Sequence, residues 1–223
     1  DELSLIPKQR YEFMDRYFKT TGMHGKNMMR GSAATQISID YSSEQDFKKK
    51  FRVACVMGPL FALLCDNAGV YEGKEYAGRM LRTSIWNDVD KDRSMLPEGA
   101  LEPDFGFRNY AEYIYDNPAI FVERENETIY TGHEPISTIY RNKYLTQNEI
   151  EHLISMFFPD VRLKNYIEIR MCDSMPIKFV LSLTALFKGL FYYDKNLEEL
   201  YEKTKDIKVA VQVINEIKKD MQS

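Results

Sequence analysis

Apolar residues recur at helical spacing over much of the chain. A long helix is expected to open at Ser42, whose distance from Gln45 is that of a capping box. Thr146 and Glu149 repeat that spacing and are expected to open another helix. Further helices are predicted at residues 7–20, 105–115, 177–193, 197–203 and 207–221.

Alternation of polar and apolar positions predicts strands at residues 31–41, 119–123 and 162–170, and residues 79–86 are also expected to be extended. A loop of about twenty residues is expected after residue 123. Because helices and strands follow one another in mixed order, we predict an α+β fold with a largely antiparallel sheet. A chain of 223 residues, 44% of them hydrophobic, can bury the core of one domain or two small ones, and we expect residues 1–223 to form one.

Charge is spread evenly along the chain. The 30 basic and 34 acidic residues leave a net charge of −4, and no run of like charge is long enough for a nucleic-acid-binding arm. The longest apolar run, residues 53–65, is too short to span a bilayer and contains Gly58-Pro59, which suits a kinked buried helix. We therefore expect neither nucleic acid nor a membrane among the partners.

The cysteines and the first residues bear on the compartment. Cys55, Cys65 and Cys172 are odd in number and have no paired spacing, while Asp1-Glu2 is acidic where a signal peptide would be basic. These features favour a reducing environment, and we expect a cytoplasmic protein.

The polar face of residues 162–170 carries the most informative chemistry. One carboxylate, Glu168, shares that face with Arg162, Lys164 and Arg170. Mg²⁺ prefers hard carboxylate oxygens together with substrate phosphates, and a guanidinium neutralises charge on a transferring phosphoryl group, so the pattern suits a metal–phosphate site. A solvated strand face with cross-strand ion pairs is the structural alternative.

Two other groups of residues allow a similar choice. Gln36, on the polar face of the first predicted strand, is placed to contact a nucleotide or simply to face solvent. Arg82, Trp86 and Arg93 are close in sequence and suit a carboxylate clamp with an indole ring beside it. Ion pairing with the neighbouring aspartates explains the same spacing.

Several motifs, in the same order along the chain, resemble those of the glutamate–cysteine ligases of plants and bacteria. Two methionines precede Ser32 and the stretch Gln36-Ile-Ser-Ile-Asp-Tyr, which is similar to the family pattern Q-V-x-L-D-Y after a threonine. The series extends nearly over the whole chain, to about Asp194, and is more specific than any single motif. The other matching segments are Glu72-Gly-Lys, the run from Arg82 through Trp86 to Arg93, Asp104-Phe-Gly-Phe, and the run from Phe158 to Asp173.

The resemblance implies the C-terminal part of a catalytic domain like that of glutamine synthetase, with a curved antiparallel sheet around ATP, metal ions and glutamate. Such a ligase uses ATP and Mg²⁺ to phosphorylate the side-chain carboxylate of glutamate. The amine of cysteine then displaces the phosphate, which is the first step toward a glutathione-type thiol.

Carried over to this chain, the resemblance implies that Glu168 is a Mg²⁺ ligand and that Arg170 binds phosphate. It implies that Arg82 holds the α-carboxylate of glutamate. Arg170 and Arg82 are therefore the expected catalytic residues.

Other positions are expected to complete the site. Gln36 corresponds to a residue at the edge of the nucleotide and metal, and we expect Arg162 and Lys164 to bind ATP as well. Ser32 keeps a hydroxyl where the family usually has threonine near glutamate, and Trp86 matches a further motif position expected to contact substrate.

Two departures leave alternatives open. Ile120 stands in the expected acceptor pocket, where the family usually carries tyrosine, so an amine other than cysteine is one alternative. A family strand with a pair of metal-binding carboxylates precedes the segment seen here, so we expect residues 1–223 to need an N-terminal segment for activity. A non-catalytic fragment or pseudoenzyme is the alternative from another class.

Overall fold

The computed structural model describes residues 3–124 and 127–207 and divides into two compact units. The first unit consists of Asp1–Ser32, Ile85–Met95 and Arg108–Pro159, and the second of Ala33–Ser84, Leu96–Phe107 and Asp160–Ser223, each as far as it is described. Each unit is therefore assembled from three separate stretches of chain. Helix α4 (Leu81–Asn87) contains residues of both.

The first unit is built around the antiparallel hairpin of β4 and β5. Helices α1 and α8 pack against β4, where Phe13 lies 6.0 Å from Phe121 between ring centroids and the His152 ring contacts the same phenylalanine. Tyr17 and Phe157 are fully buried in the core of this unit. Its elements are α1 (Gln9–Phe18), α2 (Gly25–Gly31), α5 (Lys91–Ser94), α6 (Phe107–Tyr115), β4 (Pro118–Arg124), β5 (Glu127–Pro135), α7 (Ile136–Ile139) and α8 (Gln147–Ser155).

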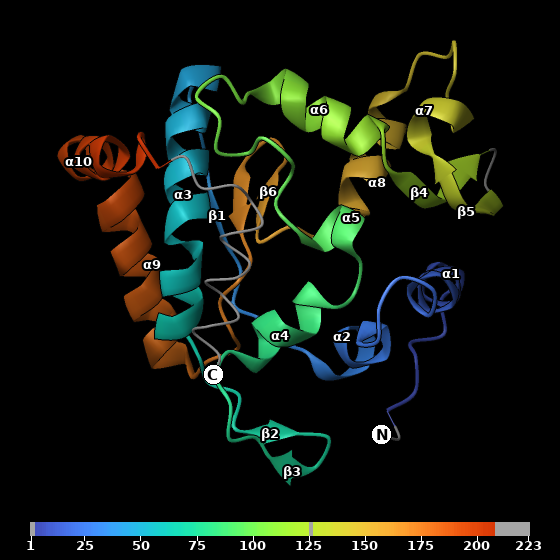
Figure 1. The fold of residues 1–223 in the computed structure, drawn as a ribbon, viewed down its shortest axis with the longest axis horizontal. Coiled ribbons are helices and arrows are strands. Elements are labelled where there is room, and N and C mark those ends of the chain that lie inside the picture. The colour runs from blue at the N-terminus through green and yellow to red at the C-terminus, as the bar shows by residue number, and fades with distance from the viewer. Residues whose placement is uncertain (1–2, 125–126, 208–223) are drawn as a thin grey trace. The chain divides into compact units, whose positions relative to one another are not determined.

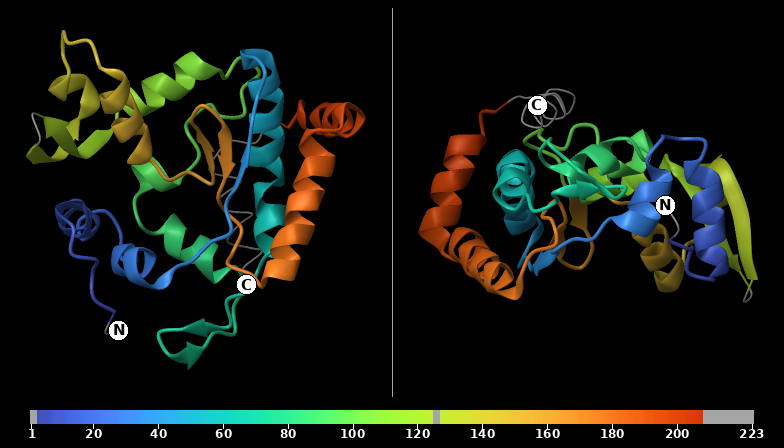
Figure 2. Two further views of the ribbon diagram at one scale, coloured as in Figure 1. Left: turned by 180° about the vertical axis from the view of Figure 1, so that it is seen from behind. Right: turned by 90° about the horizontal axis from the view of Figure 1, so that it is seen from below.

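The second unit contains a three-stranded antiparallel sheet in the order β1-β7-β6. Helix α3 packs against β6 and β7, and α9 lies beside α3, where Phe61 and Phe187 are 4.7 Å apart between ring centroids (Figures 1 and 2). A small hairpin, β2 (Val70–Tyr71) with β3 (Lys74–Glu75), follows α3. The larger elements are β1 (Ile37–Ile39), α3 (Glu44–Leu64), β6 (Val161–Leu163), β7 (Ile167–Ile169), α9 (Ile177–Phe191) and α10 (Asp194–Thr204).

The predicted mixture of helices and antiparallel sheet is confirmed, and the described strands form separate small sheets. Helices are present in the regions expected for α1, α6, α8, α9 and α10, and the capping box of Thr146 and Glu149 is formed at the start of α8. The last predicted helix, residues 207–221, lies outside the described residues except for its first position. None of the helices in the described part of the chain is long and apolar enough to cross a membrane.

The start of α3 differs from the prediction by one residue. The N-cap is Ser43, whose hydroxyl accepts a hydrogen bond from the main-chain N–H of Asp46 at 3.2 Å. Ser42 instead donates its main-chain N–H to the carboxylate of Asp46 at 2.9 Å. The capping partner is therefore an aspartate, whose short side chain reaches back to the preceding turn.

Three expected segments have a different structure. Residues 79–86 are not extended: Leu81 and Ile85 are both buried at the four-residue spacing of helix α4. The expected long loop instead contains β5 and α7. The strand was not predicted, because β5 is largely exposed and lacks a clear apolar face. Residues 162–170 form the two strands β6 and β7, and residues 31–41 contain only the short strand β1 and an Ala34–Asp173 bridge.

Candidate functional site

A buried ion cluster lies on the polar face of β6 and β7. Arg162 is directly opposite Glu168 in the register of the hairpin, and its Nε and Nη2 lie 2.9 and 2.6 Å from Glu168 Oε2. Arg170 Nη1 lies 2.8 Å from the same oxygen, and Lys164 Nζ lies 3.7 Å from Oε1. Three cations thus surround one carboxylate, with an excess of two positive charges.

The cluster is largely hidden from solvent. Only 8% of Glu168 is exposed, with 7% of Arg162 and 6% of Arg170. Burial raises the pKa of Glu168, but the nearby charges of Arg162, Arg170 and Lys164 outweigh that effect and hold the pKa below its ordinary value. Glu168 is therefore ionised at neutral pH, and the remaining positive charge favours an anion at this place.

Gln36 joins the cluster from the residue before β1. Its Oε1 accepts a hydrogen bond from Arg170 Nη1 at 3.2 Å. The antiparallel pairing of Ile37 with Ile169 brings these two polar side chains to neighbouring positions on the same face. The structure thus brings together all the residues predicted to bind ATP or a metal.

Arg82 reaches the same region from α4. Its Nη2 and Nε donate to the main-chain oxygen of Arg170 at 3.1 and 3.4 Å, and only 7% of the residue is exposed. Burial, followed by repulsion from the Arg170 charge, lowers the pKa of Arg82 to about 10, although Asp173 partly offsets this. Because burial and a like charge disfavour the cation here, an anionic ligand beside it would be stabilising.

The sequence did not identify two further features near this end of β7. Asp173 Oδ2 accepts the main-chain N–H of Asn67 at 3.2 Å, and burial raises the pKa of this carboxyl. The thiols of Cys65 and Cys172 are both buried, and their interaction lowers the pKa of Cys65 and raises that of Cys172. These side chains are about a hundred positions apart in sequence, so only the folded chain shows the contacts.

The predicted substrate-binding residues other than Arg82 belong to the first unit, whereas the cluster belongs to the second. Ser32 Oγ donates to the main-chain oxygen of Met28 at 2.9 Å. The Trp86 ring contacts Phe158, with 5.7 Å between centroids. Ile120 is fully buried, so its side chain does not face solvent in this conformation.

Ile120 also has an unusual backbone conformation. Its φ of +66° is rare for a β-branched residue, and it pairs with Gly132, whose φ of +58° is also left-handed. The pairing of β4 with β5 shifts register on both sides of Ile120, as in a β-bulge. Strained backbone of this kind is enriched at functional sites, and sequence patterns alone do not reveal it.

For Arg93, the structure favours the ion-pair alternative over a substrate clamp. The side chain is fully buried, with Nε 2.5 Å from Asp90 Oδ2. Its Nη2 donates to the hydroxyl of Tyr17 at 3.1 Å and to the main-chain oxygen of Pro118 at 2.9 Å. Arg93 therefore holds β4 and α1 to the same point in the core of the first unit.

The fold and the cluster define a mixed helix-and-sheet protein with a buried ion cluster that carries excess positive charge. Residues 1–217 match the sequence pattern of "Glutamate-cysteine ligase family 2(GCS2)", and the chain belongs to this family. The motif resemblance in the sequence is thereby confirmed.

Curated relatives agree with this assignment. The chain is 32% identical over 213 residues to the chloroplastic glutamate–cysteine ligase of Arabidopsis thaliana, covering 92% of this chain and 41% of the relative. It is 32% identical over 215 residues to the chloroplastic glutamate–cysteine ligase B of Oryza sativa subsp. japonica, covering 92% and 43%. The corresponding enzyme of Nicotiana tabacum is 31% identical, with coverage of 92% and 41%. The chain thus spans about two fifths of the length of these relatives.

The expected cytoplasmic location is wrong by this comparison, since the relatives named here are chloroplastic enzymes. The first residues of the chain are a poor guide to a targeting signal, because the chain aligns with only part of each relative.

Proposed function

We propose that this chain is part of an ATP-dependent ligase that joins the side-chain carboxylate of glutamate to the amine of cysteine. Membership of the ligase family and the buried cluster around Glu168 support the proposal. The cluster has the positive charge that suits a site for a nucleoside triphosphate, because three cations surround a single carboxylate.

The cluster provides the proposed phosphate contacts. Arg170, Arg162 and Lys164 are proposed to neutralise the phosphates of ATP, and Gln36 to orient Arg170 through the 3.2 Å hydrogen bond. An arriving phosphate competes with Glu168 for the two guanidinium groups. Groups already oriented by ion pairs need little reorganisation when charge develops on the transferring phosphoryl group, which is how such a site accelerates the reaction.

The amino-acid substrates are assigned by role. Arg82 is proposed to bind the α-carboxylate of glutamate, since a buried guanidinium beside another cation is stabilised by an anion. Ser32, Trp86 and Ile120 are proposed to serve the glutamate and acceptor sites. Because Ile120 is fully buried, its proposed effect on the acceptor is exerted through the backbone of the bulge that it occupies.

The donor set at the cluster fits phosphate better than a free metal ion. No group of three or more metal-binding side chains occurs within residues 3–124 and 127–207. Glu168 offers one carboxylate, and the cations around it already occupy its oxygens. The role of Glu168 as a ligand of nucleotide-bound Mg²⁺ stays a prediction.

We also propose that residues 1–223 are the C-terminal portion of a larger catalytic domain with a glutamine-synthetase-like fold. The small sheet β1-β7-β6 would then be part of the curved sheet of that domain. The activity, the substrates and the N-terminal segment are proposed for the whole ligase, because this chain aligns with about two fifths of its relatives.

The test is to express the complete reading frame and to measure ADP release with ATP, Mg²⁺ and glutamate, with and without cysteine. Cysteine-dependent release is expected. In Arg82→Lys, which keeps the charge but loses the paired donors, the KM for glutamate should rise at least tenfold while the KM for ATP stays unchanged.

ADP release that depends on another amine instead of cysteine would support the proposed phosphorylation of glutamate but would contradict cysteine as the acceptor. The absence of release with any amine would contradict the proposal. An unchanged glutamate KM in Arg82→Lys would contradict the assignment of Arg82.

A further inference from the structure

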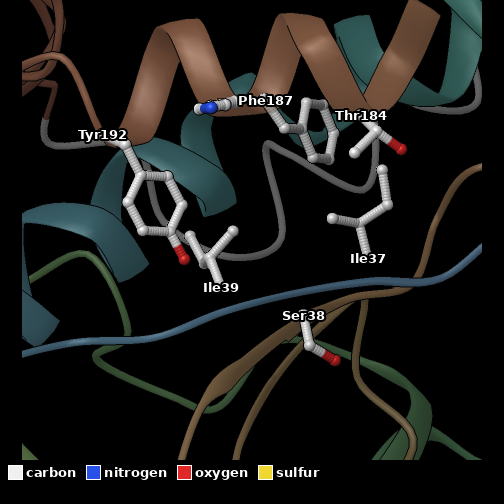
Figure 3. A pocket seen from close by; sticks show the side chains of 7 residues that line it. Ile37, Ser38, Ile39, Thr184, Phe187 and Tyr192 are labelled. Atoms are coloured by element: carbon white, nitrogen blue, oxygen red, sulfur yellow. The ribbon is translucent and has the colours of Figure 1, made fainter. Parts of the chain in front are cut away.

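The sheet β1-β7-β6 has two different faces. On one face, Ile37 and Ile39 point toward α9 and line an apolar groove of about 270 Å³, whereas Ser38 points the opposite way (Figure 3). Ser38 pairs directly with Glu168, so its side chain lies on the face that carries the ion cluster. A nucleotide bound to the cluster therefore lies on the face opposite α9.

The cluster runs from a buried end to an open end. At the buried end, Arg82 donates to the main-chain oxygen of Arg170 at 3.1 Å, and only 6% of Arg170 is exposed. At the other end, the turn of residues 164–166 joins β6 to β7, 28% of the Lys164 side chain is exposed, and Asn165 is exposed. Exposure to solvent thus increases toward the turn.

This gradient gives the bound ATP a direction. The γ-phosphate must meet the side-chain carboxylate of glutamate, and Arg82 is the proposed glutamate ligand, so the γ-phosphate belongs at the Arg170 end. Burial there also keeps water from the acyl phosphate. The nucleoside then extends toward the turn, and the four residues from Arg170 back to Tyr166 span about 13 Å of strand, enough for the remaining phosphates and the ribose.

Tyr166 places an aromatic ring at the open end. Lys164 Nζ lies 3.7 Å from Glu168 Oε1 and donates to the Tyr166 hydroxyl at 3.3 Å, so the ring lies beside the cluster. The same Nζ is 5.5 Å from the centroid of the ring, and Tyr166 is half-buried. The ring is thus partly open to solvent at the point that the nucleoside reaches.

The main chain under this ring is held in place. Lys164 N donates to the main-chain oxygen of Tyr166 at 2.8 Å, which closes the turn, and the hydroxyl of Tyr41 donates to the main-chain oxygen of Lys164 at 2.8 Å. Tyr41 itself packs edge-on against Phe47 of α3, with 5.7 Å between ring centroids. A ring on such a fixed backbone loses little further conformational freedom when a ligand stacks on it.

We infer that the Tyr166 ring binds the base of ATP by stacking on it at the open end of the cluster. The inference rests on the proposed function and adds a base contact to its phosphate contacts. Every nucleobase has a flat aromatic face, so an aromatic side chain beside a positively charged groove binds a nucleotide without reading its hydrogen-bonding groups. The alternative is that Tyr166 only positions Lys164 through the 3.3 Å hydrogen bond.

The test is calorimetric titration of ATP and of inorganic tripolyphosphate, each with Mg²⁺, into the complete protein and three variants. Tyr166→Leu keeps an apolar side chain but removes the ring, and Tyr166→Phe keeps the ring but removes the hydroxyl. Tyr144→Leu makes the first change at a fully exposed tyrosine. Tripolyphosphate has the phosphates but no base, so it reports on the cluster alone.

We expect Tyr166→Leu to weaken ATP binding about fivefold to a hundredfold, the usual range for the loss of one stacked base, and to leave tripolyphosphate binding unchanged. Tyr166→Phe and Tyr144→Leu should bind ATP with the native affinity. Native ATP affinity in a folded Tyr166→Leu protein would overturn the inference. A Tyr166→Phe protein as weak as Tyr166→Leu, or an equal loss for tripolyphosphate, would also overturn it, because the hydroxyl or the cluster would then be the cause.

The native protein alone provides a second test. It should bind ATP at least about fivefold more tightly than tripolyphosphate, and equal affinities would overturn the inference even if Tyr166→Leu does not fold. No binding of ATP to the native protein would instead contradict the proposed function. Failure of this inference, with ATP binding retained, is thus distinguishable from failure of the proposed function.

Discussion

Glu168 accepts contacts from three cations while almost completely buried, and this arrangement makes its charge important for stability. Its pKa is held below the ordinary value, because the neighbouring cations outweigh the effect of burial. A carboxyl with a lowered pKa stabilises the fold above the pKa of the unfolded state, about 4.3. That contribution is lost as the pH falls through the lower pKa of the folded state.

Glu168→Gln should therefore lower the free energy of unfolding at pH 7 by about 3 kcal/mol, because it leaves two buried guanidinium groups without their carboxylate. The difference from the native chain should shrink as the pH is lowered from 7 to 3, as the native carboxyl becomes protonated. Urea unfolding at several pH values measures this.

Glu112→Gln is the control for this prediction. Glu112 pairs with Arg108 on an exposed helix face, where ion pairs contribute little, so the change should stay within about 0.5 kcal/mol. A stability difference for Glu168→Gln that is the same at pH 7 and pH 3 would show that its charge is not the cause.

Individual residues show which features of the site could be predicted from the sequence. The shared face of Arg162, Lys164, Glu168 and Arg170 follows from alternation, and the ion cluster confirms it. The left-handed backbone of Ile120 does not, because an isoleucine gives no hint of positive φ.

At the scale of elements, helix α3 supports the sheet that carries the cluster, and its first turn depends on one cap. Ser43→Ala removes the hydroxyl that accepts the Asp46 N–H and should cost about 1 kcal/mol of stability. Ser42→Ala, one residue earlier, should cost less, because it removes only the exposed 3.2 Å bond from the Ser42 hydroxyl to Asp46, while the main-chain N–H of Ser42 keeps its bond to the same carboxylate.

Thermal unfolding of the two alanine variants measures this difference. The reverse order, with Ser42→Ala the more damaging change, would mean that the helix begins where the capping-box pattern of the sequence predicted.

The hairpin of β6 and β7 explains why a prediction of one strand still located the cluster. The turn at residues 164–166 reverses the chain and keeps the alternation of polar and apolar faces, so Arg162 faces Glu168 across the hairpin.

For residues 79–86 the spacing led to the wrong secondary structure. Residues four positions apart, such as Arg82 and Trp86, lie on the same side in both a strand and a helix. Their spacing therefore did not distinguish a strand from a helix.

At the scale of the whole molecule, three separate stretches of chain form each unit, and local patterns do not indicate this. Arg93 shows the reason: its contacts with Tyr17 and Pro118 join segments far apart in sequence. The motifs identified the family, whereas the partition into units became visible only in the folded chain.

The central claim is that the cluster around Glu168 binds the phosphates of ATP. It is tested most directly by calorimetric titration of ATP into the complete protein, in its native form, in Arg170→Gln, and in Arg108→Gln as a control at an exposed arginine. We predict that Arg170→Gln weakens ATP binding at least tenfold, and that Arg108→Gln leaves it unchanged. ATP binding by a folded Arg170→Gln protein with the native affinity would contradict the account.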